Sequence, residues 1–464
     1  MGEESIKMSA FRENRVREVF PARRAKRDRR RPGWGARLRR LALIAVFALP
    51  AAAQGESLED AWRIALDRDL SLAAAATRVA AAEAGLGAAR AERRPRVAAS
   101  VNALELDTTP AFDFSGAGLP LMMPLLDGST LVTAGATMTM PIYTSGMTRA
   151  GIDAARANLD AEQHGAAALA QQVKLAVAER YVGVLRAESA VAVADGNVAS
   201  LAAHLREVED MYRGGSVPRN DFLAAAVSLA DAEQRRLQAA NALDLARAAY
   251  NRALGRALGE PFDLDDRLPD VDSRIAEQDL DALTALALAE RSELRRLRSA
   301  ADAVSSKAAA AAAATRPQLG LTAAYTRIDN EFLNRDDYWA VGVDLQWSAF
   351  DGGRARHRAS ALSLESQALE RQRRDLESMI ALEVRQAWLT RDEAGRRVEV
   401  TQRALEQAEE NLRVARDRYR NGEGTNSEVL DAEALRTMSR DNFDAARYEA
   451  ALARYRLAYA AGVL

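Results

Sequence analysis

The sequence predicts a mainly α-helical fold with a small β part: long antiparallel helices that form coiled coils, and four short strands at their ends. Three observations lead to this fold class. The chain contains itself twice, two long stretches keep a helical pattern without proline, and four segments alternate apolar and polar residues. Aromatic residues make up only 5% of the chain while alanine is abundant, which favours close-packed helices over a large globular core.

Residues 1–53 read as a basic leader that ends in a secretory signal peptide. This stretch has 14 Lys and Arg against 5 Asp and Glu, although the whole chain has 64 and 66. Its last part runs from basic Arg37–Arg40 through apolar Leu41–Leu49 to the small residues of Pro50–Ala53. That order predicts export and cleavage after Ala53. After the leader, no apolar stretch reaches the length of a membrane-spanning helix.

The remainder reads as two internal repeats. A shift of 207 residues pairs Tyr212-Arg213 with Tyr419-Arg420, and Gly215 with Gly422. Upstream the shift becomes 222, so one insertion of 15 residues lies between residues 95 and 141. We therefore expect a first repeat at 54–262, a linker at 263–279 and a second repeat at 280–464.

Each repeat is expected to hold three helices. The first, about Leu58–Arg93 or Leu280–Thr315, is stopped by a proline. The next is a helix of roughly 100 Å, since each residue adds about 1.5 Å, and a glycine-containing turn reverses the chain after it. A third helix then returns antiparallel to the second. The long helices are expected at Met147–Arg213 and Arg354–Arg420, and the returning helices at Pro218–Leu254 and Asn426–Ala461.

Two strands per repeat lie between the first and the long helix, at about 97–106 and 131–141, then 318–327 and 338–347. In the last strand Trp339 and Trp347 bound an apolar face, and Tyr325 belongs to the corresponding face of its neighbour. Aromatic-bounded apolar faces are typical of transmembrane strands, whereas a small soluble sheet is the alternative source of alternation. Four strands cannot close a barrel, so these faces demand partners; three chains would supply twelve strands.

The sequence resembles the TolC-like outer-membrane channel-tunnel family of efflux and secretion factors. The specific segments are the corners Pro141–Gly146 and Ser348–Gly353 and the turn Tyr419–Ala432. The resemblance implies a homotrimer with a twelve-stranded barrel in outer-membrane lipid and a helical barrel in the periplasm. It also implies an exit duct for efflux or type I secretion, coupled through a periplasmic membrane-fusion adaptor to an inner-membrane pump of the RND or ABC type.

The resemblance also assigns roles at the helix turns. Glu428 and Asp431 match positions that form rings of negative charge at the periplasmic gate, although acidic residues near a helix N-terminus also simply favour the helix dipole. Asp221 and Tyr419 match gate-holding positions, but the family's arginine partner falls on Gly424, which leaves Arg219 and Arg420 as alternative partners of Asp221. The adaptor-docking turns match Gly215, Ser216 and Val217, and Gly422, Glu423 and Gly424, with ordinary helix reversal as the alternative.

No enzyme, cofactor or metal site is expected. The chain has no cysteine, and its histidines, His164, His204 and His357, lack metal-ligand spacing and read as surface residues. No cluster of basic and aromatic residues follows the leader, so no nucleic-acid partner is expected. The competing class is a soluble periplasmic coiled-coil adaptor or scaffold, which would explain the long helices but not the strands. The apolar segment Leu119–Leu126 is expected to be a loop on the extracellular side.

Overall fold

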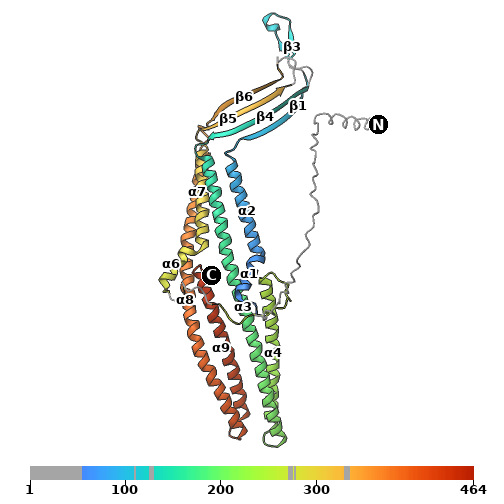
Figure 1. Cartoon of the computed structure of the whole chain (residues 1–464), viewed down its shortest axis with the longest axis vertical. Helices are drawn as coiled ribbons and strands as arrows, with labels where there is room; N and C mark the ends of the chain where they lie inside the picture. The colour runs from blue at the N-terminus through green and yellow to red at the C-terminus, as the bar shows by residue number, and fades with distance from the viewer. Residues whose placement is uncertain (1–54, 109–110, 125–129, 270–274, 276–277, 329–334) are drawn as a thin grey trace, which may run out of the picture. The chain divides into compact units, whose positions relative to one another are not determined.

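The computed structural model describes residues 55–108, 111–124, 130–269, 275, 278–328 and 335–464. The predicted leader at 1–53 lies outside these residues, as do parts of the predicted linker and of the insertion. Among the described residues, helices dominate. A four-stranded sheet lies at one end of the long helices, and the turns that reverse the chain after these helices lie at the other end (Figure 1). The predicted fold class, mainly α with a small β part, is confirmed.

Two sets of elements follow one another in the same order. The paired helices have equal lengths of 11, 22, 67 and 35 residues. The first set is α1 (Leu58–Arg68), α2 (Leu70–Ala91), β1 (Arg96–Glu105), β4 (Thr130–Tyr143), α3 (Met147–Arg213) and α4 (Arg219–Ala253). The second set is α6 (Leu280–Glu290), α7 (Ser292–Ala313), β5 (Gln318–Ile328), β6 (Asp337–Gln346), α8 (Arg354–Arg420) and α9 (Asn426–Ala460).

The prediction of one continuous first helix in each repeat is wrong, because a break divides this helix into α1 and α2 in the first repeat and into α6 and α7 in the second. Asp69 and Arg291 take extended conformations at the two breaks, with ψ of 120° and 116°. Asp69 caps α2 by accepting hydrogen bonds from the backbone N–H of Ser71 and Leu72. The side chain of Arg291 instead reaches Glu383 and the carbonyl oxygen of Ala460.

Glycine turns fill both breaks. Gly255, after α4, and Gly462, after α9, both have positive φ. A Cβ atom at Gly255 would lie 3.3 Å from Cβ of Arg68, and one at Gly462 would lie 3.2 Å from the backbone nitrogen of Arg291. The returning helices therefore end against the breaks. Each break thus makes room for the end of another helix.

The sheet is antiparallel, in the order β1-β4-β5-β6. Its register pairs Leu321 with Val343 and Tyr325 with Trp339, so the apolar positions of neighbouring strands share one face. Thr139, Thr322 and Gly342 lie across from one another on the opposite face. The predicted alternation of the strands is confirmed by this register. A bulge between Pro141 and Tyr143 shifts the register of β4 against β5 beside the helices.

The insertion contains a small hairpin where only a loop was expected. Strands β2 (Ala111–Asp113) and β3 (Met122–Pro124) pair around the 3₁₀ turn η1 (Ser115–Ala117). Part of the segment Leu119–Leu126, namely Leu125 and Leu126, lies outside the described residues. Strands of three residues carry too little alternation to be recognised in a sequence.

The helices pack around three apolar cores. One joins α1, α3, α4 and α9, the second joins α6, α7, α8 and α9, and the third lies where the hairpins α3–α4 and α8–α9 end. The third core positions the candidate site. Within the described part of the chain, no helix is both long and apolar enough to cross a membrane.

Candidate functional site

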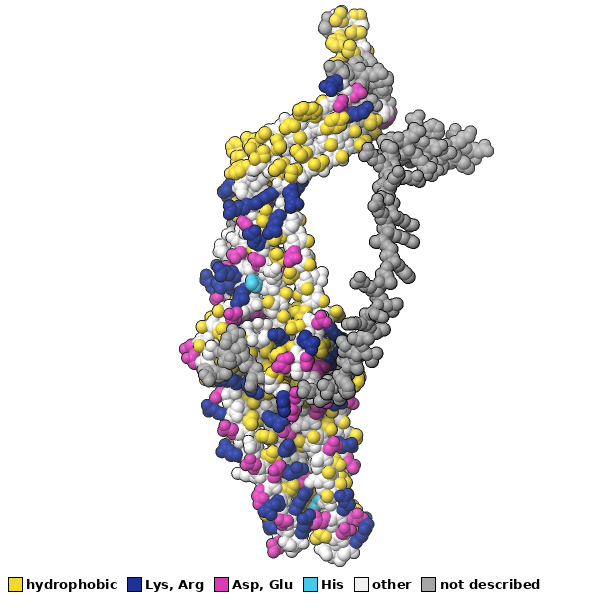
Figure 2. Space-filling model, in the orientation of Figure 1, with side chains coloured by type: hydrophobic (Ala, Val, Ile, Leu, Met, Phe, Trp, Pro, Cys, Tyr) yellow, Lys and Arg dark blue, Asp and Glu magenta, His cyan; other side chains and the backbone are white. Residues whose placement is uncertain are grey.

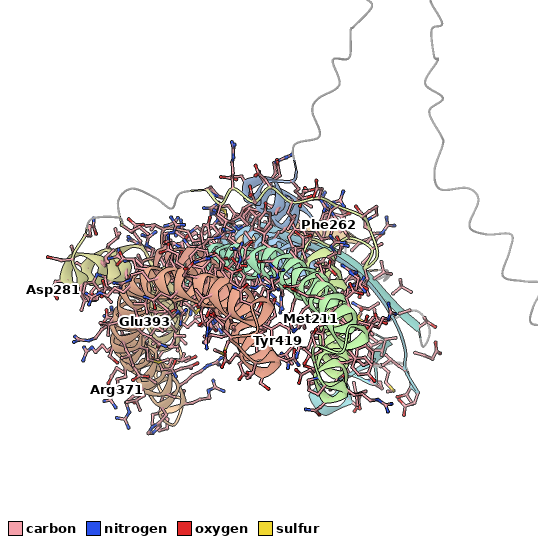
Figure 3. The ribbon with its side chains drawn as sticks, turned by 90° about the horizontal axis from the view of Figure 1, so that it is seen from below. Met211, Phe262, Asp281, Arg371, Glu393 and Tyr419 are labelled. Atoms are coloured by element: carbon pink, nitrogen blue, oxygen red, sulfur yellow. The ribbon has the colours of Figure 1, made fainter. Side chains whose placement is uncertain are left out.

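The turns of the two helical hairpins carry most of the predicted site residues. Here Val208 of α3, Ala225 of α4, Leu412 of α8 and Val429 of α9 form one buried cluster. Seen from below, Met211 and Tyr419 lie between the hairpins, next to each other (Figure 3). The hairpins therefore contact each other through an apolar core just before the turns. We call this region the tip.

The two turns of the tip have the same geometry. Gly215 and Gly422 have φ of 76° and 75°, the left-handed region that glycine adopts without strain. The N–H groups of Ser216 and Glu423 donate to the carbonyl oxygens of Met211 and Arg418 at 2.9 Å, which completes a Schellman cap on α3 and on α8. The predicted glycine caps are confirmed. Four of the predicted docking residues, Gly215, Ser216, Gly422 and Glu423, are exposed, whereas Val217 and Gly424 are half-buried.

His204 is buried, contrary to the surface position expected for it. Only 3% of the residue is exposed, and its Nε2 lies 2.8 Å from Oδ1 of Asn426, the first residue of α9. The Nδ2 of Asn426 donates to the carbonyl oxygen of Asp221 at 3.1 Å. Since a carboxamide oxygen only accepts, Nε2 of His204 must carry the proton. Asn426 therefore connects α3, α4 and α9 through two hydrogen bonds.

Tyr419 and Asp221 lie near each other, but without a hydrogen bond. The Tyr419 hydroxyl is buried and has no hydrogen-bond partner among the described residues. Burial raises the pKa of this phenol, and the charges of Asp221 and Glu207 raise it further. The ring of Tyr419 instead lies against that of His204, with centroids 5.6 Å apart.

Neither alternative arginine pairs with Asp221. Nε of Arg420 donates to Glu207 at 2.7 Å, an ion pair between α8 and α3. Arg219 is exposed and has no ion-pair partner within the described residues. Gly424 is also closely surrounded, because a Cβ there would lie 3.2 Å from Arg418 and Glu428. The tip is thus held by Asn426 and by the Arg420 ion pair.

Glu428 and Asp431 are both exposed on the first turns of α9. The N–H of Glu428 donates to Oγ1 of Thr425, which caps the helix, and its carboxylate lies 3.4 Å from Nη1 of Arg418. Asp431 has no ion-pair partner in the part of the chain that the structure describes. One carboxylate is therefore partly balanced by a cation and the other faces solvent alone.

A series of buried and half-buried polar contacts between α3 and the hairpin α8–α9 was not expected from the sequence. Glu433 is only 1% exposed and accepts from Arg416 at 3.0 Å and from Arg436 at 2.7 Å. The pairs of this polar seam, from the sheet side toward the turns, are Ser189 with Asp444, Asn197 with Thr437, Arg416 with both Ser200 and Glu433, and His204 with Asn426. Polar residues recurring at helical spacing on α3 and on α9 were the available signal.

The sheet presents its apolar face to the surroundings. Trp339 is 75% exposed, Trp347 61% and Tyr325 44%. Tyr325 and Trp339 are direct cross-strand partners at one end of the face. Trp347 follows β6 at the other end, where its indole N–H donates to the carbonyl oxygen of Thr315. Aromatic residues therefore bound the apolar face at both of its edges, as the sequence predicted.

A groove of about 1270 Å³ runs below the sheet, between α2, α3, α7 and α8. Small side chains line much of it, and Lys307, Arg354, Glu162 and Glu365 are among its charged residues. A second hollow shares Met147 with this groove and is lined by Thr139, Thr322 and other residues of the polar sheet face. The groove and the polar face therefore lie on one side of the chain.

Comparison with known proteins agrees with this geometry. A sequence profile of the family described as "Outer membrane efflux protein" matches residues 62–256 and 283–463. Alkaline protease secretion protein AprF of Pseudomonas aeruginosa is 24% identical over 306 residues, which is 63% of this chain. The match spans 62% of the length of that relative.

Solved structures share the fold. VceC of Vibrio cholerae superimposes with a TM-score of 0.76 at 19% identity, over 87% of this chain and 96% of that one. The CmeC outer membrane channel of Campylobacter jejuni gives 0.76 at 15% identity, over 88% and 86%. The open state of the MtrE outer membrane channel of Neisseria gonorrhoeae gives 0.70 at 19% identity, over 88% and 89%. The profile covers most of the chain and both hairpins, and the chain therefore belongs to the outer membrane efflux protein family.

Proposed function

We propose that three copies of this chain form a channel in the outer membrane, which serves as the exit duct of a tripartite efflux or type I secretion system. The observation that carries the proposal is the sheet, whose apolar face is exposed and whose edge strands β1 and β6 each pair with a single strand of the part that the structure describes. In hydrocarbon, every backbone N–H and C=O needs a partner, so such edges must pair with those of other copies. Three sheets of four strands then close a twelve-stranded barrel.

The polar face of the sheet and the groove below it would line the passage. Both lie on one side of the chain and are rich in Thr, Gly and Ala, as a wide aqueous duct requires. Substrate would pass without a binding step, from an inner-membrane pump of the RND or ABC type and its periplasmic adaptor to the exterior. The exposed turns at Gly215–Ser216 and Gly422–Glu423 are the proposed docking points for the adaptor.

The tip is the proposed periplasmic gate. Three copies of Glu428 and Asp431 around a common axis would form a ring of negative charge that attracts cations. Opening would separate the hairpin α8–α9 from α3–α4, and the polar seam lies along that interface. Because its groups can rehydrate when they separate, such an interface opens with less exposure of apolar surface than a fully apolar one.

Planar-bilayer recordings test the gate. The double substitution Glu428→Gln and Asp431→Asn should shift the reversal potential in a salt gradient toward zero, because the cation-attracting ring is removed. A matched control, Glu399→Gln with Glu409→Gln, removes two exposed carboxylates of α8 away from the tip and should leave the potential unchanged. Equal reversal potentials for the wild type and the tip variant would discard the acidic ring.

Membrane extraction separates the channel from the competing class, a soluble adaptor or scaffold. A channel should leave the membrane only with detergent, because its sheet faces lipid. A scaffold should be released by high salt or carbonate. Release without detergent would overturn the proposed function.

A further inference from the structure

Five arginines gather along the helix-side edge of the apolar sheet face. Arg93 and Arg94 lie between α2 and β1, Arg316 lies between α7 and β5, and Arg149 and Arg356 occupy the first turns of α3 and α8. All five are exposed. Figure 2 shows Lys and Arg side chains gathered directly below the hydrophobic surface of the sheet, on the same face. We call these five residues the basic rim.

The basic rim has little compensation by carboxylates. Arg149 lies 3.9 Å from Asp153, and the other four arginines make no ion pair with any carboxylate of the described residues. Elsewhere on the long helices many arginines do have such partners, for example Arg413 with Glu410 and Arg420 with Glu207. The positive charge of the rim is therefore available to an external anion.

Aromatic residues lie between the apolar face and the rim. The Trp347 indole donates to the carbonyl oxygen of Thr315, which immediately precedes Arg316. Tyr143 and Phe350, 60% and 89% exposed, precede the starts of α3 and α8. Along the molecule, apolar strands thus give way to aromatic rings and then to guanidinium groups. A bilayer leaflet has the same sequence of acyl chains, interface and charged headgroups.

The opposite edge of the sheet differs in charge. Glu105, Asp107, Asp336 and Asp337 lie there together with Arg327 and Arg335, and Arg327 is directly across from Asp337 in the register. Among the described residues at the two edges of the sheet, an excess of positive charge is therefore found beside the helices. The N-terminus of α3 begins at the same edge and adds its positive dipole end, whereas at the start of α8 the carboxylate of Asp351 already accepts from the N–H groups of Gly353 and Ala355.

We propose that the basic rim binds the headgroups of anionic phospholipids in the leaflet on the helix side of the sheet. This inference rests on the proposed function, because it requires the apolar face to lie in a membrane. A guanidinium group forms paired hydrogen bonds with two phosphate oxygens, and an arginine close to an anionic surface is attracted to it. The rim would thereby fix the depth of the sheet in the bilayer and favour phosphatidylglycerol over zwitterionic lipid among its neighbours.

Lipid capture tests this inference. The full chain is reconstituted in phosphatidylcholine vesicles that hold a minor share of phosphatidylglycerol, released in mild detergent, and analysed by native mass spectrometry for the lipids that stay bound. The rim variant carries Arg93→Gln, Arg94→Gln, Arg316→Gln and Arg356→Gln. The control variant carries Arg206→Gln, Arg371→Gln, Arg374→Gln and Arg385→Gln, which removes the same charge from exposed arginines of α3 and α8 away from the sheet.

The wild type and the control should retain phosphatidylglycerol well above its share in the vesicle. The rim variant should lose about fivefold or more of that preference, since one arginine near an anionic surface already contributes about that factor. If both variants insert into the vesicles and retain the same share of phosphatidylglycerol, the inference about the basic rim is overturned while the proposed function stands. Failure of the wild type to insert into the vesicles would overturn the proposed function and the inference together.

Discussion

Asn426 connects three helices at the tip through the two ends of its side-chain amide. Its partners are the imidazole of His204 on α3 and the backbone carbonyl of Asp221 on α4. The side chains of Asn426 and His204 are both buried, so loss of the Asn426 amide leaves the N–H of His204 buried without an acceptor. The resemblance to the channel-tunnel family implied an arginine partner for Asp221 at the position of Gly424, whereas here the contact to Asp221 comes from Asn426.

Asn426→Ala should therefore destabilise the tip by about 1–3 kcal/mol, the cost of an unsatisfied buried polar group. Thermal unfolding of the purified protein in detergent measures this change. Asn411→Ala, at an exposed position of α8, is the control and should cost much less. Equal midpoints for the two variants would show that Asn426 does not hold the tip.

Tyr419 leads to a different expectation. Because its buried hydroxyl has no partner among the described residues, Tyr419→Phe should change the free energy of unfolding by no more than about 1 kcal/mol. If instead the hydroxyl held the gate, as the family relationship implies, the variant would lower the unfolding temperature and raise the open probability in bilayers. Either of those results would contradict the structure at this residue.

The same tyrosine makes the tip sensitive to alkali. Burial, with the charges of Asp221 and Glu207, raises the pKa of Tyr419 above its ordinary value of 10.0. The stability that depends on the neutral phenol is fully present below pH 10 and is lost as the pH rises through the raised pKa. The loss of stability between neutral pH and pH above 10 should thus be smaller in Tyr419→Phe than in the wild type. Identical pH profiles would contradict this assignment.

At the scale of elements, the two turns depend on glycine at Gly215 and Gly422. A side chain at either would have to adopt positive φ, at a cost of about 1 kcal/mol. Gly395, in the middle of α8, has open space around its Cβ position, so Gly395→Ala should stabilise by up to about 1 kcal/mol. Unfolding midpoints of the three single variants check this: the midpoint should fall for Gly215→Ala and Gly422→Ala and rise for Gly395→Ala. A stabilised Gly215→Ala or Gly422→Ala variant would contradict the cap geometry.

Local signals explain which elements could be predicted from the sequence. The long helices lack proline and end in glycine, and the strands alternate with a period of two, so neighbours in sequence carry the information. The break at Arg291 could not be predicted in this way, because its side chain is held by Glu383 and by the carbonyl of Ala460, both distant in sequence. His204 was assigned to the surface for the same reason, since its partner Asn426 lies 222 residues away.

For the candidate site, the predicted residues fall at one tip, but their predicted contacts do not all form. Glu428 and Asp431 lie on the first turns of α9, as expected from their spacing. The contacts of Asp221 depend on how four helices meet, and spacing along one helix carries no information about that. The seam around Glu433 likewise depends on three helices together, because Arg416 of α8 contacts both Ser200 of α3 and Glu433 of α9.

In the assembled molecule, the two faces of the sheet must meet different surroundings. Trp339, Val341, Val343, Leu345 and Trp347 share an exposed apolar face, while Asp344 lies beside Thr322 on the polar one. In a water-soluble protein this apolar face would stay exposed to water, and a contiguous apolar patch of several large side chains is unfavourable there. Lipid on one side and an aqueous duct on the other satisfies both faces.

Site-directed spin labelling of β6 tests this claim most directly. The chain has no cysteine, so a single cysteine at each position from Ala340 to Leu345 takes one label in vesicle-reconstituted protein. Collisions with oxygen, which concentrates in lipid, should be frequent at Val341, Val343 and Leu345, whereas a water-soluble nickel chelate should reach the alternate positions. Equal access of the chelate to every position of the strand would show that neither face of the sheet lies in lipid.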